Sequence, residues 1–168
     1  MAIFISVLAL FATLYELYQQ RILSEKSVRP LAQVDLGDLD KQIYVYVRNN
    51  GMGPMIVDKV TFVKNGKQYT NIEDCIDIPA STYMYVLVSE TVKKLVLPGS
   101  HLMVFEKDFE DKTDISMEQV RKMLTPITLI INYRDVFDKK FSVERDFAWF
   151  SRRDLRKDKF VSQGSCEV

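Results

Sequence analysis

Histidine and cysteine are scarce in this chain of 168 residues, which contains one His and two Cys. Any Ser-His-Asp or Cys-His triad would have to use His101, and no G-x-S-x-G segment marks a nucleophile. Cys75 and Cys166 lie far apart, and the absence of a C-x-x-C pair argues against a structural zinc site. We therefore predict that the protein is not an enzyme and that it needs no metal or other cofactor.

Glycine and proline are also few, with 6 and 5 residues, which excludes collagen-like and linker-like chains. Charge of one sign is not in excess, because 23 basic residues balance 23 acidic ones. Nucleic-acid-binding domains are usually strongly basic, so we expect no direct DNA binding. The segment "GMG" at 51–53 lacks the third glycine and the following helix of a dinucleotide-binding loop.

Acidic residues gather at two places without completing a known site. Asp35, Asp38 and Asp40 have part of a calcium-loop spacing, but no glycine and distal glutamate complete it. We expect a solvated turn there. Two further acidic pairs are expected to form a soluble loop: Glu106 with Asp108, and Glu110 with Asp111.

A long apolar run opens the chain, with "MAIFISVLALFATLYELYQQR" at residues 1–21. A secretory signal peptide would need a basic segment before the run and a small-x-small cleavage site, and neither is present. A core helix would have one apolar stripe and a polar back, whereas residues 2–15 are apolar all round except Ser6 and Thr13. We favour a single transmembrane helix over residues 1–23.

Basic residues follow this segment and none precedes it: Arg21, Lys26 and Arg29 all lie on its C-terminal side. The positive-inside rule then predicts a single-pass protein of the inner membrane, with the N-terminus outside and the folded part in the cytoplasm. The two cysteines agree with a reducing compartment.

Four polar side chains interrupt the apolar run on one side of the expected helix. At about 100° per residue, Ser6, Thr13, Glu16 and Gln20 fall within roughly 80° of one another, opposite the bulky aromatic residues. One hypothesis is a ring of helices whose small and polar faces line a lumen. The alternative is that Glu16 lies at the level of the lipid headgroups and reaches water.

The period of the apolar residues changes to two after a polar joint at residues 24–30. Asn65-Gly66 between apolar runs predicts a tight hairpin, and Ser116 with Gln119 predicts a capped helix over 114–124. Alternating or β-branched runs predict strands at 41–49, 55–64, 81–90, 97–107, 127–135 and 141–150. We predict a mainly β protein in which residues 31–150 form a cytosolic, immunoglobulin-like antiparallel β-sandwich of about seven strands with one short helix.

The C-terminal tail, residues 151–168, is basic near its start. Its basic residues are Arg152, Arg153, Arg156, Lys157 and Lys159. Contact with anionic lipid, RNA or an acidic partner is one interpretation. Because Asp154 and Asp158 lie among them, a solvated and partly self-paired end is the other.

The apolar anchor followed by "SVRP", "NNGMGP" and "NYRDVF" resembles a broad group of small bacterial membrane-tethered proteins with an immunoglobulin-like cytosolic module. The layout is similar to the pore-forming accessory proteins of type VI-B CRISPR phage defence. That resemblance implies a ring-shaped homo-oligomer in the lipid bilayer, membrane depolarisation and an RNA-guided effector protein as partner. The alternative is a membrane-tethered adaptor that forms no pore and docks a cytosolic partner through its β-sandwich.

Overall fold

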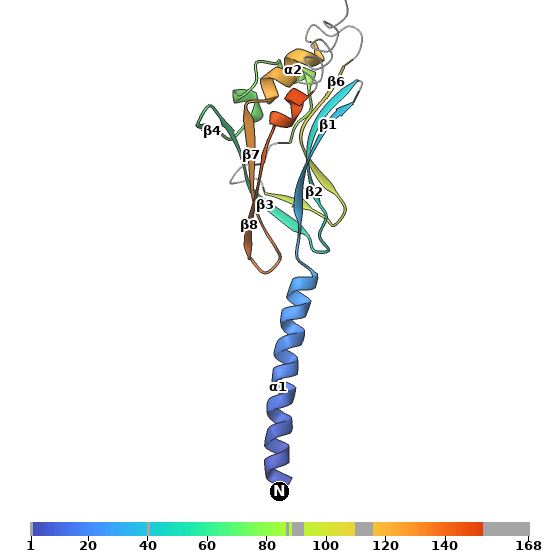
Figure 1. Ribbon diagram of the computed structural model, residues 1–168, viewed down its shortest axis with the longest axis vertical. Helices are drawn as coiled ribbons and strands as arrows, with labels where there is room; N and C mark the ends of the chain where they lie inside the picture. The colour runs from blue at the N-terminus through green and yellow to red at the C-terminus, as the bar shows by residue number, and fades with distance from the viewer. Residues whose placement is uncertain (1, 40, 87, 89–92, 110–115, 153–168) are drawn as a thin grey trace, which may run out of the picture.

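The computed structural model describes residues 2–39, 41–86, 88, 93–109 and 116–152. A single long helix, α1 (Ala2–Ser27), projects from one end of a β domain, as Figure 1 shows. Its 26 residues give a length of about 39 Å at 1.5 Å per residue. No part of its most apolar window is buried against the rest of the chain. Helix α1 is thus long and apolar enough to cross a membrane, and it runs into the predicted polar joint as far as Ser27.

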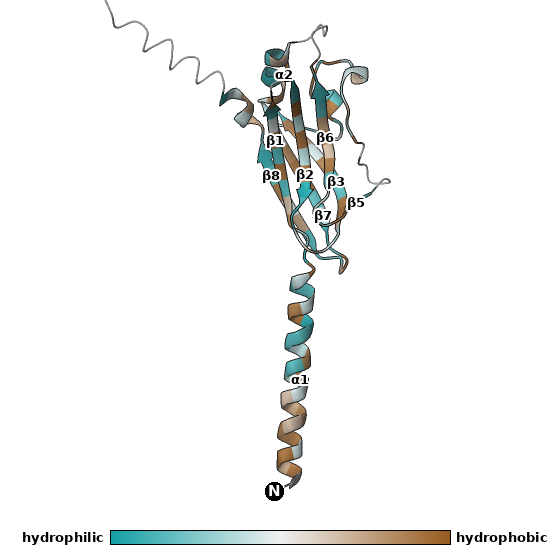
Figure 2. Cartoon of the chain, turned by 90° about the vertical axis from the view of Figure 1, so that its right-hand side faces the viewer, coloured by the Kyte–Doolittle hydropathy of each residue, from teal (hydrophilic) through white to brown (hydrophobic). Residues whose placement is uncertain are grey.

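Hydropathy divides α1 into two halves. Figure 2 shows that the half toward the N-terminus is hydrophobic, whereas the half next to the domain is largely hydrophilic. Most of the large apolar side chains of the first half, among them Phe4, Leu8 and Phe11, are more than half exposed. Exposed apolar surface of this extent is unfavourable in water, so α1 needs a cover that the β domain does not provide.

The β domain consists of two antiparallel sheets, which confirms the predicted mainly β architecture. The three-stranded sheet has the order β1 (Ala32–Leu39), β2 (Gln42–Asn49), β6 (His101–Asp108). The second sheet has the order β4 (Lys67–Tyr69), β3 (Met55–Lys64), β7 (Ile127–Arg134), β8 (Lys140–Asp146), and β5 (Lys94–Val96) also pairs with β3.

The core lies between the two sheets. Alternate residues of β2, Ile43, Val45 and Val47, are fully buried, while the residues between them point outward. Leu129 and Ile131 of β7 are buried in the same cluster. The strand predicted at 41–49 is therefore present, with the alternation of buried and outward residues that a period of two indicates.

Helix α2 (Met117–Leu124) and the 3₁₀ turn η3 (Ala148–Ser151) pack together at the end of the domain opposite α1 (Figure 1). The predicted capping box is present: the Gln119 N–H donates to Ser116 Oγ at 3.3 Å, and the Ser116 N–H donates to Gln119 Oε1 at 2.9 Å. Val120 and Leu124 are buried.

The predicted hairpin is also present. Asn65 and Gly66 have φ angles of 52° and 76° and connect β3 to β4. Both central residues of such a turn need positive φ, which Asn and Gly adopt at low cost.

The expected solvated turn around Asp35 and Asp38 is wrong, because both residues lie within β1. Asp38 is buried, and its carboxylate forms a two-pronged ion pair with Arg121 of α2, with N–O distances of 2.8 and 3.2 Å. An aspartate can occupy an inward strand position when an arginine neutralises it there. Asp40 lies outside the described residues.

The strand predicted over 81–90 is wrong as well. Residues Ala80–Thr82 form a 3₁₀ turn, and among the described residues of 81–88 pairing with β6 is limited to a bridge between Met84 and Glu106. The ring of Tyr83 packs against Phe105, and Lys107 Nζ donates to the Thr82 carbonyl at 2.8 Å. These contacts from β6 hold the segment in an irregular course.

Glu106 and Asp108 belong to β6 and not to an acidic loop. The prediction failed because the alternation of β6 continues through both acidic residues. Glu110 and Asp111 lie outside the described residues.

Candidate functional site

The short connection between α1 and β1, residues 28–31, is packed against the domain. Pro30 is buried, and the connection passes over the loop that follows β2. A Cβ at Gly53 would lie 1.6 Å from the Val28 carbonyl oxygen, and a Cβ at Gly51 would lie 2.3 Å from the Arg29 carbonyl oxygen. Only glycine permits so close an approach of two backbones. The contact of this loop with the connection was not among the predictions from the sequence.

Asn49 fastens the connection to two loops of the domain. Its side chain is fully buried, and its Oδ1 accepts from the Leu31 N–H at 3.2 Å. Its other hydrogen bonds reach Gly51 and Gly53 in the loop after β2, and Val96, Gly99 and Ser100 around the loop after β5. We refer to residues 28–31 with Asn49, Gly51 and Gly53 as the joint.

Aromatic contacts support the other side of the joint. The guanidinium of Arg29 lies over the ring of Phe141 at 4.4 Å, and that ring stacks on Tyr133. The hydroxyl of Tyr133 accepts from the Ala32 N–H at 3.5 Å. Residues of β7 and β8 thus hold the connection from the second sheet.

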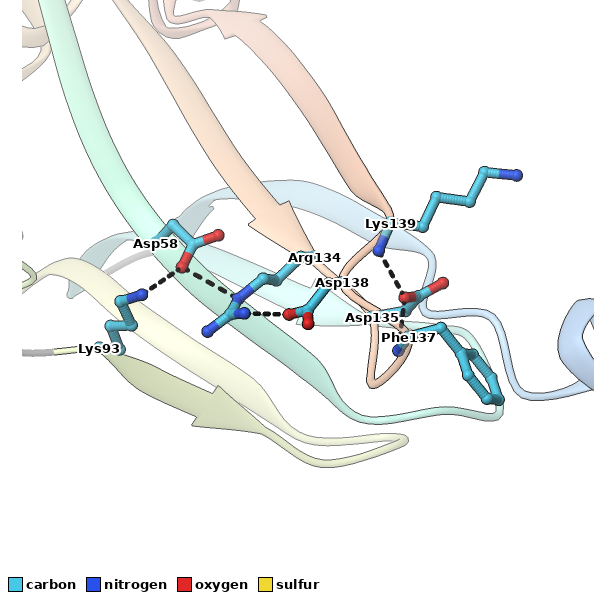
Figure 3. A network of polar contacts seen from close by, with 7 residues as sticks. All are labelled: Asp58, Lys93, Arg134, Asp135, Phe137, Asp138 and Lys139. Atoms are coloured by element: carbon cyan, nitrogen blue, oxygen red, sulfur yellow. Dashed lines mark hydrogen bonds and ion pairs between the residues drawn. The ribbon is translucent and has the colours of Figure 1, made fainter.

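A charged network ties the strand ends next to the joint, as Figure 3 shows. Asp58 of β3 lies 3.3 Å from both Lys93 Nζ and Arg134 Nε. Arg134 also pairs with Asp138 in the β7–β8 hairpin. Two cations and two carboxylates balance one another here, so the network fixes the hairpin at the end of the sheet.

The β7–β8 hairpin, residues 135–139, has a rigid turn and exposed apolar residues. One carboxylate oxygen of the buried Asp135 accepts from the backbone N–H groups of Phe137 and Lys139, at 2.8 and 2.9 Å (Figure 3). Val136 and Phe137 are 51% and 53% exposed. A cleft of about 500 Å³ separates this hairpin from the end of α1.

The outer face of the three-stranded sheet carries a row of stacked rings. The Tyr46 ring stacks on Tyr44 and on His101, with 4.4 Å between centroids in each case. Tyr44 also covers Gly37 of β1, where a Cβ would lie 2.0 Å from the ring. Gln33 and Arg48 lie beside the row, and Arg48 forms an ion pair of 2.9 Å with Asp35.

Tyr46 is fixed within this row. Its hydroxyl donates to Glu106 Oε2 at 2.5 Å, and the second oxygen of Glu106 accepts from Gln42. Partial burial and the nearby Glu106 carboxylate raise the pKa of the Tyr46 hydroxyl well above its ordinary value. The Tyr46 ring is therefore held in a fixed position with its hydroxyl protonated. We refer to Tyr44, Tyr46, Arg48 and His101 as the aromatic face.

The four polar residues predicted to line a lumen or contact another helix are all exposed on α1: Ser6, Thr13, Glu16 and Gln20. Thr13 Oγ1 donates to the Ala9 carbonyl at 2.9 Å, within the helix itself. Contact between copies of α1 stays a prediction.

Of the predicted basic contacts in the tail, Arg152 alone lies among the described residues. Its guanidinium stacks on Trp149 at 3.2 Å, directly after η3 and thus at the end of the domain opposite α1. Arg153, Arg156, Lys157 and Lys159 lie outside the described residues.

Within the part of the chain that is described, no group of three or more His, Cys, Asp or Glu is placed to hold a metal ion.

Comparisons with known proteins give little. No family model matches the chain, and no curated protein matches it. Two similar solved structures come from Sulfolobus acidocaldarius. One is the archaellum periplasmic stator protein FlaG, with 14% identity and a TM-score of 0.26 over 68% of this chain and 100% of that chain. The other is the periplasmic stator complex of FlaF and FlaG, with 13% identity and a TM-score of 0.26 over 70% of this chain and 91% of that one. Because both TM-scores are this low, neither structure supports an inference about the fold or function of this chain.

Proposed function

We propose that the protein is a membrane-tethered adaptor that holds a protein-binding surface at a fixed orientation to the bilayer. The joint carries this proposal. A passive tether needs only a loose linker, whereas here two backbones interlock at Gly51 and Gly53 and Asn49 binds both sides. Such packing transmits the orientation of α1 to the β domain.

The aromatic face is the surface that we propose for the partner. Tyrosine and arginine are enriched where proteins bind one another, because they offer large contact areas and hydrogen bonds together. Stacking fixes the rings before binding, so little side-chain entropy is lost when a partner docks. A protein whose matching surface contains apolar and hydrogen-bonding groups would fit.

Site-specific photo-crosslinking in native membranes tests this surface. A benzophenone amino acid at Tyr44 is expected to give one discrete adduct, and Arg48→Glu in the same chain is expected to remove it. The matched control places the benzophenone at Glu144, exposed on β8 of the other sheet, where no adduct is expected. Equal adducts at both positions would contradict the proposal.

We also propose that the domain lies in the cytoplasm. This orientation rests on Arg21, Lys26 and Arg29 at the domain end of α1. Protease added to the outside of intact spheroplasts should leave the domain uncut, whereas lysed spheroplasts should lose it. Cleavage from the outside would reverse the orientation.

A pore is the second candidate, favoured by the exposed polar residues along one side of α1. In this function, copies of the chain form a ring and Glu16 faces the lumen. Glu16→Leu should then change ion leakage, and replacement of residues 2–20 by an unrelated apolar helix should abolish it. Retained function after that replacement would favour the adaptor. The RNA-guided partner and the role in antiviral defence stay predictions from the resemblance in layout.

A further inference from the structure

We propose that the cleft between α1 and the β7–β8 hairpin binds the headgroup of an anionic phospholipid in the bilayer that α1 crosses. The inference rests on the membrane tether proposed above, and it adds a lipid ligand to it. Ile22, Lys26 and Arg29 line one side of the cleft, and Phe137 and Lys139 line the other.

The first argument is depth. A hydrocarbon layer of about 30 Å accommodates about 20 helical residues, which from Ala2 reach approximately Arg21. The headgroup layer beyond it is about 6 Å thick and accommodates about four more residues. Residues 22–25 therefore lie at the level of the headgroups, and Lys26 lies at the outer edge of that layer. Because the hairpin shares a cleft with these residues, its tip lies near the same level.

The second argument is charge. Lys26, Arg29 and Lys139 form no ion pair with a carboxylate among the described residues. Three cations that converge on one cleft attract a phosphate group.

The acidic residues of the cleft do not cancel this charge locally. The Glu25 carboxylate lies 3.1 Å from Arg21 on the helix, and the Asp135 carboxylate is buried against backbone N–H groups of the hairpin. Both carboxylates are thus already engaged, so a lipid phosphate can bind the three basic groups.

The third argument is the apolar tip. Val136 and Phe137 are about half exposed although they lie in a turn that Asp135 holds rigid. In water such a tip is unfavourable, but apolar side chains are favourably buried where headgroups meet acyl chains. A bound lipid would place its phosphate beside Lys139 and its glycerol region beside Phe137.

A label on the hairpin of the full chain tests the proposal. Val136→Cys with Cys166→Ser carries an environment-sensitive dye, and the protein is placed in nanodiscs containing brominated lipids. We expect the dye to be quenched when phosphatidylglycerol is mixed with phosphatidylcholine, and to stay in water when phosphatidylcholine is used alone. Lys26→Gln or Lys139→Gln should each raise the phosphatidylglycerol fraction needed for half-quenching, in line with a loss of about fivefold in headgroup affinity for each charge.

Controls separate the possible outcomes. Lys67→Gln removes an exposed charge from β4, away from α1 (Figure 1), and should leave the quenching unchanged. Unchanged emission of Trp149 shows that a variant is folded. If the full chain does not insert into nanodiscs, this result would overturn the proposed membrane tether and with it the proposed lipid site. A dye that stays in water in both lipid mixtures would overturn the lipid site alone. Loss of quenching on addition of inorganic phosphate at constant ionic strength would assign the cleft to free phosphate instead.

Discussion

Helix α1 and the β domain differ in how their polar side chains find partners and in how their apolar side chains are covered. In α1 the interactions are local: Thr13 bonds to Ala9, and Arg21 pairs with Glu25, each within four residues. The domain has local pairs too, but others join distant segments, as Asp38 does with Arg121, 83 residues away. The helix leaves its apolar surface uncovered and the domain buries its own. These features are typical of a helix that crosses a bilayer, where a helix satisfies its backbone hydrogen bonds by itself.

Two phenylalanines give the largest contrast. Phe105→Ala removes a fully buried ring and should lower the free energy of unfolding of the domain by about 4 kcal/mol. Phe11→Ala removes a ring that is 64% exposed on α1 and should leave the domain unchanged. Denaturant titration in detergent, followed by Trp149 fluorescence, measures both variants. Equal losses would mean that α1 packs on the domain.

Two arginines give the second contrast. Arg121→Met leaves the buried Asp38 without its arginine and should cost about 3 kcal/mol of stability. Arg21→Met breaks an exposed pair on α1 and should cost about 0.5 kcal/mol or less. The double variant Asp38→Leu with Arg121→Met should recover most of the loss. Without that recovery, the arginine would be needed for more than the charge of Asp38.

The joint is where the two regions meet, and Gly53→Ala tests how firmly they are coupled. The new methyl group would collide with the Val28 carbonyl, so the connection must shift, at a cost of about 2 kcal/mol. Spin labels on α1 and β8 should report a broader distance distribution than in the unchanged chain. Met52→Ala, at an exposed side chain between the two glycines, is the control. An unchanged distribution in Gly53→Ala would argue against a rigid joint.

The smallest effect concerns a buried hydroxyl of the domain. Burial, followed by the charge of Glu73, raises the pKa of Tyr83 to about 12, and no described residue accepts a hydrogen bond from its hydroxyl. A raised pKa means that the fold favours the protonated hydroxyl. The resulting contribution to the free energy of unfolding is complete below pH 10, the ordinary pKa, and is lost as the pH rises through 12. Tyr83→Phe should be nearly neutral at pH 7 and should weaken the alkaline loss of stability. Unfolding curves at pH 7 and at pH 11 check both statements, and an unchanged alkaline loss would contradict the assignment.

The two regions also differ in how well their sequence predicted them. The apolar run predicted α1, the period of two predicted β2, and the Asn65-Gly66 pair predicted the hairpin, because each of these depends on neighbours in the chain. Strand β1 was missed because Asp35, Gly37 and Asp38 are typical of turns. Its acidic residues become acceptable only beside Arg48 and Arg121, which come from other elements.

The sequence by itself determined a helix able to cross a bilayer, a mainly β domain and its principal turns, since local periodicity and turn chemistry are enough for these. Only the tertiary structure decided that "NNGMGP" locks the connection to α1, that three rings stack on one sheet, and that Lys26 and Lys139 face one cleft. Apart from the neighbouring Tyr44 and Tyr46, these arrangements join residues from 18 to more than 100 positions apart, and no local pattern specifies which distant groups will meet.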